Sequence, residues 1–435
     1  MSYIGSYLVS TKYNDTVFTI GVPQVFKFGL GVSKEAGYEA KKLGLKSILM
    51  VVDKRVAETK TFEEVKASVE DEGIKVYVTT HIHYEPTDTA IIEAYKEVKE
   101  LQIDGFLALG GGSTIDTAKA LNLLYCYPAD IMDYVSKPIG KGMPPPGPLK
   151  PLIAIPTTAG TGSETTPTIV LDIEKLKLKT GIRHAYIRPT VALVDPLTTI
   201  TMPPMVTASS ALDVLTHAAE SLTAHPYTAR PAVKNPEERP VYVGATPIGD
   251  IFAIEAIKWV NKYVRRAYAN PYDMEARYYL ALGASIAGIG FGHAGVHVPH
   301  SMAYPIAGKI KKWHPPDYEF GYPIVPHGIA VTIPAPYAFK YLTPYNYEKF
   351  TMFMKAVGLD VEGLTIRELG EVIYEYLIEL LEDLKIPTTL REIGFGKEDL
   401  NDLVEGTMAQ RGLLARAPKT ITKEDIEKIF LEMIE

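Results

Sequence analysis

The first half of the chain alternates short apolar runs with amphipathic segments. The apolar runs are typical of buried strands and lie at residues 46–53 (KSILMVVD), 74–80 (IKVYVTT), 104–110 (DGFLALG), 151–158 (PLIAIPTT) and 191–196 (VALVDP). Segments with helical spacing separate the first three, at residues 60–73 and 87–101. Strands that alternate with helices of this length predict a parallel sheet with helices packed on it, which is an α/β domain.

The pattern becomes mostly helical after Met202. Apolar residues recur at helical spacing over residues 209–225, 249–268, 274–291 and 369–384. A length of 435 residues also exceeds one ordinary core. We therefore predict an α/β domain at residues 1–202 and an all-α domain at residues 203–435.

The helix predicted at residues 209–225 carries two polar side chains on one face. Asp213 and His217 are four residues apart among leucines and alanines, so both point the same way and can chelate one ion. The second half also groups His293, His297 and His300 in GFGHAGVHVPHSMAYP, followed by His327 in IVPHGIAV. One carboxylate and three imidazoles suit Fe(II) or Zn(II), although spacing leaves open which of the three clustered histidines bind.

A glycine-rich loop joins the predicted strand at 104–110 to a helix. Gly110, Gly111 and Gly112 allow close backbone approach to a ligand, and the new helix offers N–H groups to an anion. Ser113 and Asp116 also fit a local helix cap, but three glycines exceed what a cap needs, which favours a pyrophosphate site.

Two further features suit a nucleotide. The loop at residues 156–168 (PTTAGTGSETTPT) is dense in glycines and small hydroxyls and suits wrapping a nicotinamide and its ribose, although a plain turn has the same composition. Asp53, at a strand end, can accept from an adenosine ribose and would favour NAD over NADP, although a solvated strand-end aspartate is equally common.

Composition narrows the class of protein. Hydrophobic residues make up 46% and charged residues 22%, as in ordinary globular proteins. A formal net charge of −7 gives no basic face for nucleic acid, and no apolar stretch reaches the length of a membrane span. The N-terminus lacks the features of signal and transit peptides, so a cytoplasmic enzyme is predicted. Cys126, the single cysteine, excludes an intrachain disulfide and a cysteine-based metal cluster.

Five motifs in this order resemble the iron-containing (group III) alcohol dehydrogenase family: GGGSTIDTAKA, PTTAGTGSE, LDVLTHAAES, HSMAYPIAG and VPHG. Two longer stretches, GHAGVHVPHSMAYPIAG and RPVYVGATPIGD, are similar to its hydroxyacid-oxoacid transhydrogenase branch. The resemblance implies a dinucleotide-binding α/β domain with a parallel sheet, followed by an all-helical metal-binding domain.

The resemblance also implies the residues of both sites. The implied metal ligands are Asp213, His217, His300 and His327. The implied contacts of NAD are Asp53, Gly111, Gly112, Ser113, Asp116, Thr157, Thr158, Thr161 and Lys179.

Three departures from the family pattern affect the expected chemistry. Tyr304 stands where many members have the second histidine of HxMAH, so Tyr304, His293 or His297 would have to handle the proton. Glu85 replaces a frequent asparagine near the expected ribose contacts. An insertion, KIKKWHPPDYEFGYP, follows His300, and we expect it to lie over the substrate cleft. Its lysines, Lys309, Lys311 and Lys312, are candidates for capturing a substrate carboxylate, and a solvated basic face is the equally favoured alternative.

The expected activity is metal-assisted hydride transfer with NAD between an alcohol or hydroxyacid and the corresponding aldehyde, ketone or oxoacid. Within it, exchange of the 4-hydroxybutyrate/2-oxoglutarate type competes with plain oxidation of small primary alcohols. A lyase of the dehydroquinate synthase type and a non-catalytic NAD- or metal-binding protein are the alternatives from other classes. Fe(II) is the expected metal, with Zn(II) as the alternative, and the expected assembly is a homodimer without nucleic-acid or membrane partners.

Overall fold

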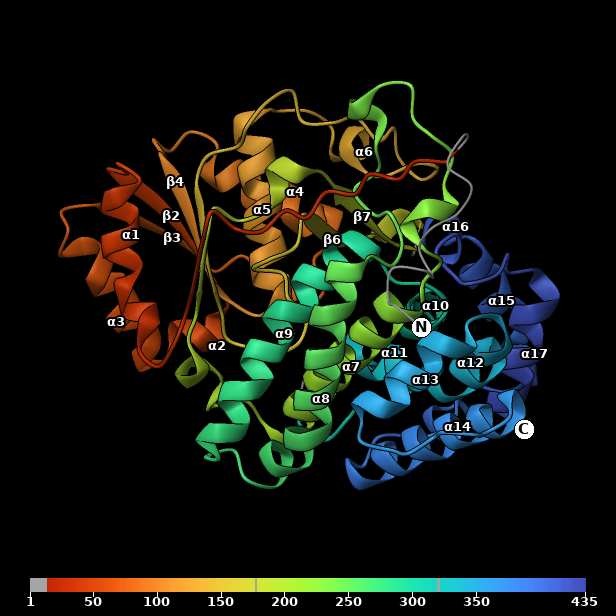
Figure 1. The fold of residues 1–435 in the computed structure, drawn as a ribbon. Coiled ribbons are helices and arrows are strands. Elements are labelled where there is room, and N and C mark those ends of the chain that lie inside the picture. The colour runs from red at the N-terminus through yellow and green to blue at the C-terminus, as the bar shows by residue number, and fades with distance from the viewer. Residues whose placement is uncertain (1–13, 177, 319–320) are drawn as a thin grey trace. The chain divides into compact units, whose positions relative to one another are not determined.

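The computed structural model of the chain describes residues 14–176, 178–318 and 321–435. The described chain forms two compact units, Gly21–Met202 and Pro203–Glu435, and residues 14–20 belong to the second of them (Figure 1). This last point differs from the predicted range of 1–202 for the first domain. The reason is electrostatic, because Asp15 is buried against Arg230 and Arg239 at 3.0 and 2.9 Å.

The unit Gly21–Met202 is built on a six-stranded parallel sheet, as predicted. Its strands, in spatial order, are β1 (Val25–Phe28), β8 (Val191–Val194), β5 (Leu152–Pro156), β4 (Gly105–Gly110), β2 (Ser47–Val52) and β3 (Lys75–Thr79). β1 was not predicted, because its four residues are all half-buried and show no apolar run. The glycine-rich loop leaves the sheet from β4, which lies between β5 and β2.

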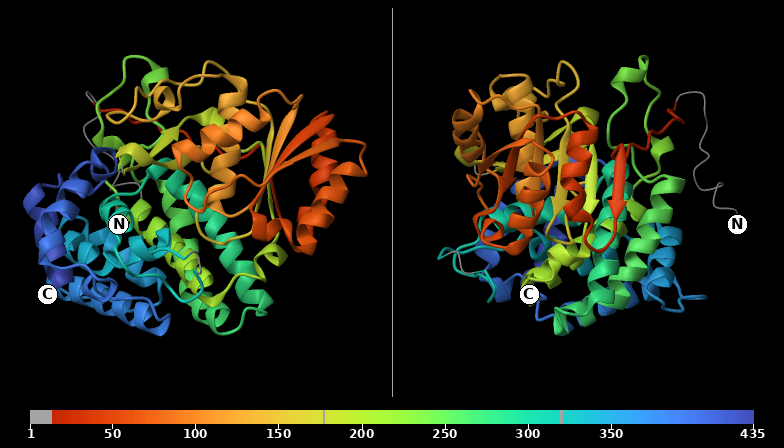
Figure 2. Two further views of the ribbon diagram at one scale, coloured as in Figure 1. Left: turned by 180° about the vertical axis from the view of Figure 1, so that it is seen from behind. Right: turned by 90° about the vertical axis from the view of Figure 1, so that its left-hand side faces the viewer.

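Helices cover both faces of this sheet (Figure 2). In β2, Ile48 and Met50 pack with α1 (Ala36–Lys42) and α3 (Lys60–Glu70). Leu49 and Val51 point to the opposite face. That face is covered by α4 (Asp88–Val98) and α5 (Gly112–Cys126). A strand buried on both sides reads as a continuous apolar run, which explains why the strand predictions succeeded here.

Smaller elements complete this unit. Two short helices are α2 (Lys54–Ala57) and α6 (Ile131–Tyr134). Two antiparallel strands, β6 (Thr168–Ile173) and β7 (Leu178–Arg183), pair so that Asp172 faces Lys179. The sequence pattern did not predict this pair, because charged residues interrupt its apolar positions. After α3, Gly73 has a φ of 76°, a left-handed conformation that lets the chain turn into β3.

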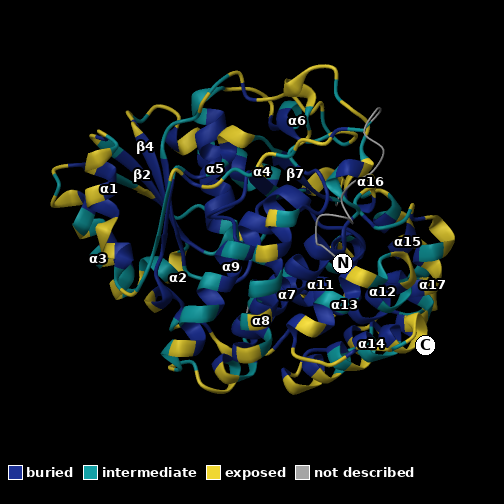
Figure 3. Cartoon of the chain, in the orientation of Figure 1, coloured by how far each residue is buried: buried dark blue, intermediate teal, exposed yellow. Residues whose placement is uncertain are grey.

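The second unit is helical over its described residues, apart from isolated bridges. Its helices are α7 (Pro204–Thr223), α8 (Pro247–Ala269), α9 (Met274–Ala294), α10 (Val298–Gly308), α11 (His327–Thr332), α12 (Ala335–Leu342), α13 (Tyr347–Ala356), α14 (Ile366–Asp383), α15 (Leu400–Met408), α16 (Arg411–Leu414) and α17 (Lys423–Ile434). Helix α7 packs against α8, α9 and α11 and is buried over most of its length (Figure 3). A helix enclosed on every side can place polar groups away from bulk water.

Within the described residues, no single helix has the length and apolar character of a membrane span. Helices α9 and α10 reach that length and apolar character only when they are taken together, and the pair is bent by 104° at the break between them.

Candidate functional site: a buried metal-ligand group and two loops for a nucleotide

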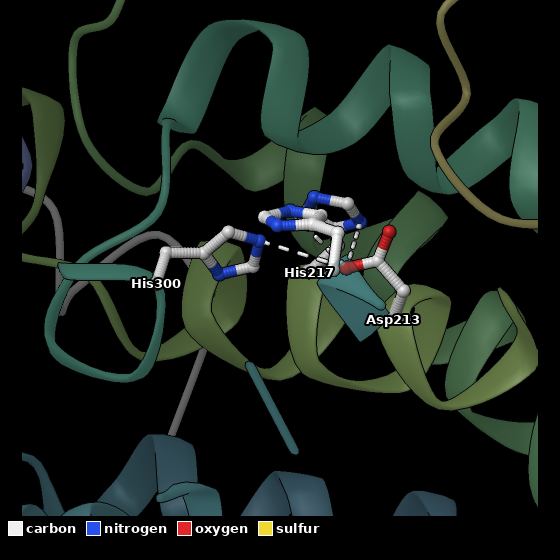
Figure 4. A group of neighbouring side chains, drawn as sticks. Asp213, His217 and His300 are labelled. Atoms are coloured by element: carbon white, nitrogen blue, oxygen red, sulfur yellow. Dashed lines mark ion pairs between the residues drawn. The ribbon is translucent and has the colours of Figure 1, made fainter. Parts of the chain in front are cut away.

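Three helices of the second unit bring four polar side chains to one point. Asp213 and His217 come from α7, His300 from α10, and His327 from the first position of α11. Their ligand atoms all lie within 4.8 Å of one another, and three of the four residues are buried. Figure 4 shows Asp213, His217 and His300 turned toward a common centre. The structure therefore brings together the four residues predicted as ligands.

The distances in this group suit a shared ion better than hydrogen bonds. The Oδ1 atom of Asp213 lies 3.6 Å from His217 Nδ1, 3.7 Å from His300 Nε2 and 3.9 Å from His327 Nε2. These separations exceed the roughly 3.2 Å limit of an N–H···O bond. Two ligand atoms bound tetrahedrally at metal distances are about 3.4 Å apart. The buried His217 Nδ1 and His300 Nε2 atoms have no hydrogen-bond partner among the described residues. One carboxylate oxygen and three imidazole nitrogens therefore fit a divalent metal ion.

A fifth residue, Glu220, supports the group from behind. Its side chain is fully buried and accepts hydrogen bonds from His300 Nδ1 and from the His297 N–H at 2.7 Å. A proton held on His300 Nδ1 leaves the lone pair of Nε2 for the ligand side. Sequence reasoning missed Glu220, although a signal was present. Glu220 lies seven residues after Asp213 and three after His217, which places all three on one face of α7.

Burial and neighbouring charges set the protonation of these groups. Burial, together with the nearby His300 and His327, holds the pKa of His217 well below its usual range, so that this ring is neutral. Burial alone would also lower the pKa of His300, but the Glu220 and Asp213 carboxylates raise it overall. Burial would raise the pKa of Glu220, yet its contacts with His300 and His297 lower it. Glu220 is therefore an ionised carboxylate that accepts a hydrogen bond from His300, and the proton stays on His300 Nδ1.

Ring stacking fixes the orientation of His217. Its imidazole lies over the Phe291 ring of α9, with centroids 3.9 Å apart and an interplanar angle of 6°. On the other side the His300 ring lies 4.5 Å away. These contacts hold the plane of the His217 ring.

The three candidates for proton handling differ in their surroundings. His297 uses both ring nitrogens inside the protein, because Nδ1 accepts from the Val298 N–H at 2.8 Å and Nε2 bonds to Thr223 Oγ1 at 3.0 Å. Burial lowers the pKa of His297 to about 4. His297 therefore caps α10 through Nδ1 and bonds to a threonine hydroxyl through Nε2, and its predicted role in proton handling stays a prediction.

His293 and Tyr304 are placed differently. His293 is buried in α9, where its Nδ1 donates to the Ile289 carbonyl at 2.6 Å. Tyr304 is half-buried on α10, and its ring centroid lies 6.3 Å from that of His327. Tyr304 therefore lies beside the predicted ligand His327.

The lysines of the insertion are engaged by acidic partners. Lys309 pairs with Asp402 at 2.9 Å, and Lys311 pairs with Asp399 at 2.5 Å. These ion pairs favour the solvated basic face over the predicted capture of a substrate carboxylate. The insertion also reaches α7, because Asp317 accepts from the Met205 N–H at 2.7 Å and caps the helix that carries Asp213.

The predicted nucleotide residues gather at the carboxyl ends of the parallel strands. Gly111 is the N-cap of α5 and Gly112 is its first residue, and no side chain caps this end. The capping-box alternative for Ser113 and Asp116 is thereby excluded, because the Ser113 hydroxyl donates instead to the Tyr84 carbonyl. An N-terminus that no side chain caps fits an anion such as a pyrophosphate.

The loop after β5 packs directly on the glycines. A Cβ on Gly112 would lie 2.5 Å from Cγ2 of Thr161, so glycine is required there by the neighbouring loop. A Cβ on Gly111 would lie 3.3 Å from Cγ2 of Thr158, and the Thr157 N–H donates to the Gly110 carbonyl at 3.0 Å. The two loops identified from the sequence are therefore one surface in the folded unit.

Three predicted contacts also have partners within the protein. Asp53 caps α2 by accepting from the Arg55 N–H at 2.9 Å. It directly follows β2, whose last residue is in register with the strand that enters the glycine loop. Lys179 on β7 pairs with Glu85 and lies 3.9 Å from Asp172. Asp116 accepts hydrogen bonds at both carboxylate oxygens inside the protein, and its predicted contact with NAD stays a prediction.

Both halves of the chain match family models. The model for iron-containing alcohol dehydrogenase matches residues 23–196, and that for the C-terminal part of the Fe-containing alcohol dehydrogenase family matches residues 238–434. The chain therefore belongs to the iron-containing alcohol dehydrogenase family and is an oxidoreductase. This membership confirms the family predicted from the five motifs.

Individual relatives agree with this assignment. The chain is 43% identical over 423 residues to the mitochondrial hydroxyacid-oxoacid transhydrogenase of Bos taurus, covering 97% of this chain and 91% of that protein. It is similar in structure to an alcohol dehydrogenase from Oenococcus oeni, with a TM-score of 0.83 and 28% identity over 96% of this chain and 100% of that one. It also resembles a sulfoacetaldehyde reductase from Bifidobacterium kashiwanohense in complex with NAD+, with a TM-score of 0.78 and 25% identity over 97% and 100%.

The predicted cytoplasmic location is contradicted by the transhydrogenase relatives. Those of Bos taurus and Rattus norvegicus are named as mitochondrial. The prediction rested on the N-terminal residues, the net charge and the lack of an apolar span, and the last two do not distinguish one compartment from the other.

Replacement of a predicted metal ligand should remove the metal and leave the protein folded. His327 is half-buried at the start of α11, so we expect His327→Ala to lose most bound metal and nearly all activity while the protein remains folded. Metal analysis and a thermal melt would measure both effects, with His314→Ala as a control outside the ligand group. Retention of metal and activity by His327→Ala would remove His327 from the site.

Loss of the supporting carboxylate should weaken metal binding without removing a ligand. Glu220→Gln keeps the shape of the side chain but removes the charge that stabilises the His300 Nδ1 proton, so metal affinity should fall by about 10- to 100-fold. Chelator competition with Zn(II) measures this change, and Glu348→Gln, an exposed change on α13, is the control. Equal affinity in Glu220→Gln and wild type would contradict the supporting role.

Proposed function

We propose that this protein transfers hydride between a small hydroxyacid and an oxoacid, with NAD as the carrier and Fe(II) at the Asp213 group. The observation that carries the proposal is the placement of three imidazole nitrogens 3.6 to 3.9 Å from one buried carboxylate oxygen. The substrate class follows from similarity over 97% of the chain to a relative named hydroxyacid-oxoacid transhydrogenase. Iron is favoured by the donor set and by the name of the family.

A divalent ion held by Asp213, His217, His300 and His327 would supply a Lewis acid that polarises the substrate oxygen. The residues of the chain prepare the site for it. Glu220 keeps a proton on His300 Nδ1, and burial keeps His217 neutral, so both rings offer a lone pair. The stack of His217 on Phe291 holds the plane of the His217 ring.

Proton handling is assigned to Tyr304 in this proposal. The family's second histidine is absent at this position, and His297 has both ring nitrogens engaged. Tyr304 is half-buried beside His327, and its hydroxyl group can both donate and accept a proton. We therefore expect the Tyr304 Oη atom to exchange the proton that an alcohol loses on oxidation.

NAD binding rests on the α/β unit. The N-terminus of α5 would receive the pyrophosphate, with Thr158 and Thr161 beside it. Asp53 follows β2, next to the strand that leads into the glycines, where its carboxylate can accept from ribose hydroxyls. Support for this role comes from the structural relative solved in complex with NAD+.

A plain alcohol dehydrogenase is the second candidate, and one observation favours it. A carboxylate substrate needs a cation, yet Lys309 and Lys311 are already paired with Asp402 and Asp399. The structural relative from Oenococcus oeni is named alcohol dehydrogenase. The choice between the two candidates is therefore a question of substrate, on one shared metal site.

The charge of Asp53 should set the preference for NAD over NADP, because it would repel the 2′-phosphate. Asparagine caps helices as well as aspartate, so Asp53→Asn removes the charge and keeps the cap on α2. The ratio of kcat/KM for NAD to that for NADP should fall by about tenfold. Equal use of the two cofactors by the wild type would show that Asp53 has no such role.

The substrate class is tested by supplying two substrates with only a trace of NAD. We expect 4-hydroxybutyrate to be oxidised to succinate semialdehyde while 2-oxoglutarate is reduced to 2-hydroxyglutarate in equal amount. Both products are followed by chromatography, and each substrate alone is the control. Formation of neither product, with rapid NAD-linked oxidation of neutral alcohols, would instead establish the plain alcohol dehydrogenase.

A further inference from the structure

A fully buried lysine lies behind the glycine-rich loop. Lys119 of α5 has no exposed surface, and its Nζ donates to Ser163 Oγ at 2.7 Å and to the Thr168 carbonyl at 2.8 Å. Asp116, one turn earlier, lies 3.3 Å from it. Burial lowers the pKa of Lys119, while the Asp116 carboxylate opposes that change. Well-packed apolar side chains of similar volume often stabilise a protein as much as a buried ion pair does. Stability alone therefore does not explain why Asp116 and Lys119 are buried here.

The partners of this pair belong to three separate segments. Asp116 Oδ1 accepts from the Ser163 hydroxyl, and Asp116 Oδ2 accepts from the Val170 N–H at 2.8 Å. Helix α5, the loop after β5 and strand β6 are therefore joined by one polar cluster, which consists of Asp116, Lys119 and Ser163. Each member of the cluster is at least nine-tenths buried.

Two of these segments, α5 and the loop after β5, carry most of the nucleotide residues, whereas Asp53 follows β2 and Lys179 lies on β7, the partner strand of β6. Gly112 and Ser113 begin α5. Thr161 accepts from the Ser163 N–H at 3.2 Å and packs on Gly112. Lys179 is the cross-strand neighbour of Asp172 in the β6–β7 pair. The cluster thus lies one layer below the surface on which the cofactor would rest.

We infer that Asp116 and Lys119 are positioning residues that set the spacing of the two nucleotide-binding loops. The inference rests on the NAD binding proposed above. Apolar side chains would fill the same space, but they cannot fix a hydroxyl and two backbone groups at set directions. Hydrogen bonds to charged groups can, because they are strong and directional. A shift of either loop by about 1 Å would misalign the contacts to the pyrophosphate.

The test separates stability from cofactor binding. Lys119→Met leaves a buried carboxylate without its cation, so the melting temperature of the metal-loaded protein should fall by about 5 °C or more. The double variant Asp116→Asn/Lys119→Met is neutral and keeps an acceptor for Val170 and a donor for Ser163. Most of the lost melting temperature should therefore return, while the Kd for NAD stays raised by at least about tenfold. Metal content should not change in either variant.

Ser163→Ala provides a second route to the same question. It removes the hydroxyl that joins the ion pair to the loop without leaving a charge unpaired, and it should also raise the Kd for NAD. Ser68→Ala, a half-buried hydroxyl change in α3, is the matched control. Calorimetric titration with NAD gives Kd for every variant, independently of activity.

The outcomes are distinguishable. Wild-type Kd in both the double variant and Ser163→Ala would reduce the cluster to a stabilising role and overturn the inference. A wild-type protein that binds no NAD would overturn the proposed function, and the inference with it. A raised Kd with a recovered melting temperature and unchanged metal content supports positioning.

Discussion

The helical unit depends on one constraint, the burial of the Asp213 carboxylate among three imidazoles. A buried carboxylate is expensive unless cations or hydrogen-bond donors surround it. Three helices place ring nitrogens 3.6 to 3.9 Å from its Oδ1 atom, which is too far for hydrogen bonds, so a divalent cation held among these atoms would meet that requirement. The neighbouring helices α8, α9 and α11 enclose α7, and this packing keeps Asp213 and His217 away from bulk water.

Glu220 shows how the charge of this group is arranged. It lies on the same face of α7 as Asp213 and His217, but it turns toward the backbone of α10 and the far nitrogen of His300. The predicted ligand Asp213 and Glu220, which supports the predicted ligand His300, therefore come from one helix and are seven residues apart. His297 precedes α10, and its ring caps that helix.

The α/β unit uses a comparable arrangement around Lys119. Asp116 and Lys119 are buried behind a surface of glycines and threonines. Such small residues alone make few contacts that could fix the position of that surface. Glu85 belongs to the same pattern, because it meets Lys179 while its neighbour Tyr84 accepts from Ser113.

Much of this protein was determined by local sequence. Strands β2, β4, β5 and β8 are buried on both faces, and their continuous apolar runs identified them and the parallel sheet. The Asp213–His217 spacing placed two ligands on one helical face, because a helix repeats every 3.6 residues. The motifs identified the family, and with it His300 and His327.

Tertiary structure decided the rest. The roles of His297, Asp116, Lys309 and Lys311 depended on partners distant in the chain, such as Thr223, Val170, Asp402 and Asp399, and no local pattern records such partners. The sequence alone does not distinguish a polar side chain that binds a ligand from one that bonds to a neighbouring helix. Only the fold determines which of the two lies within hydrogen-bonding distance.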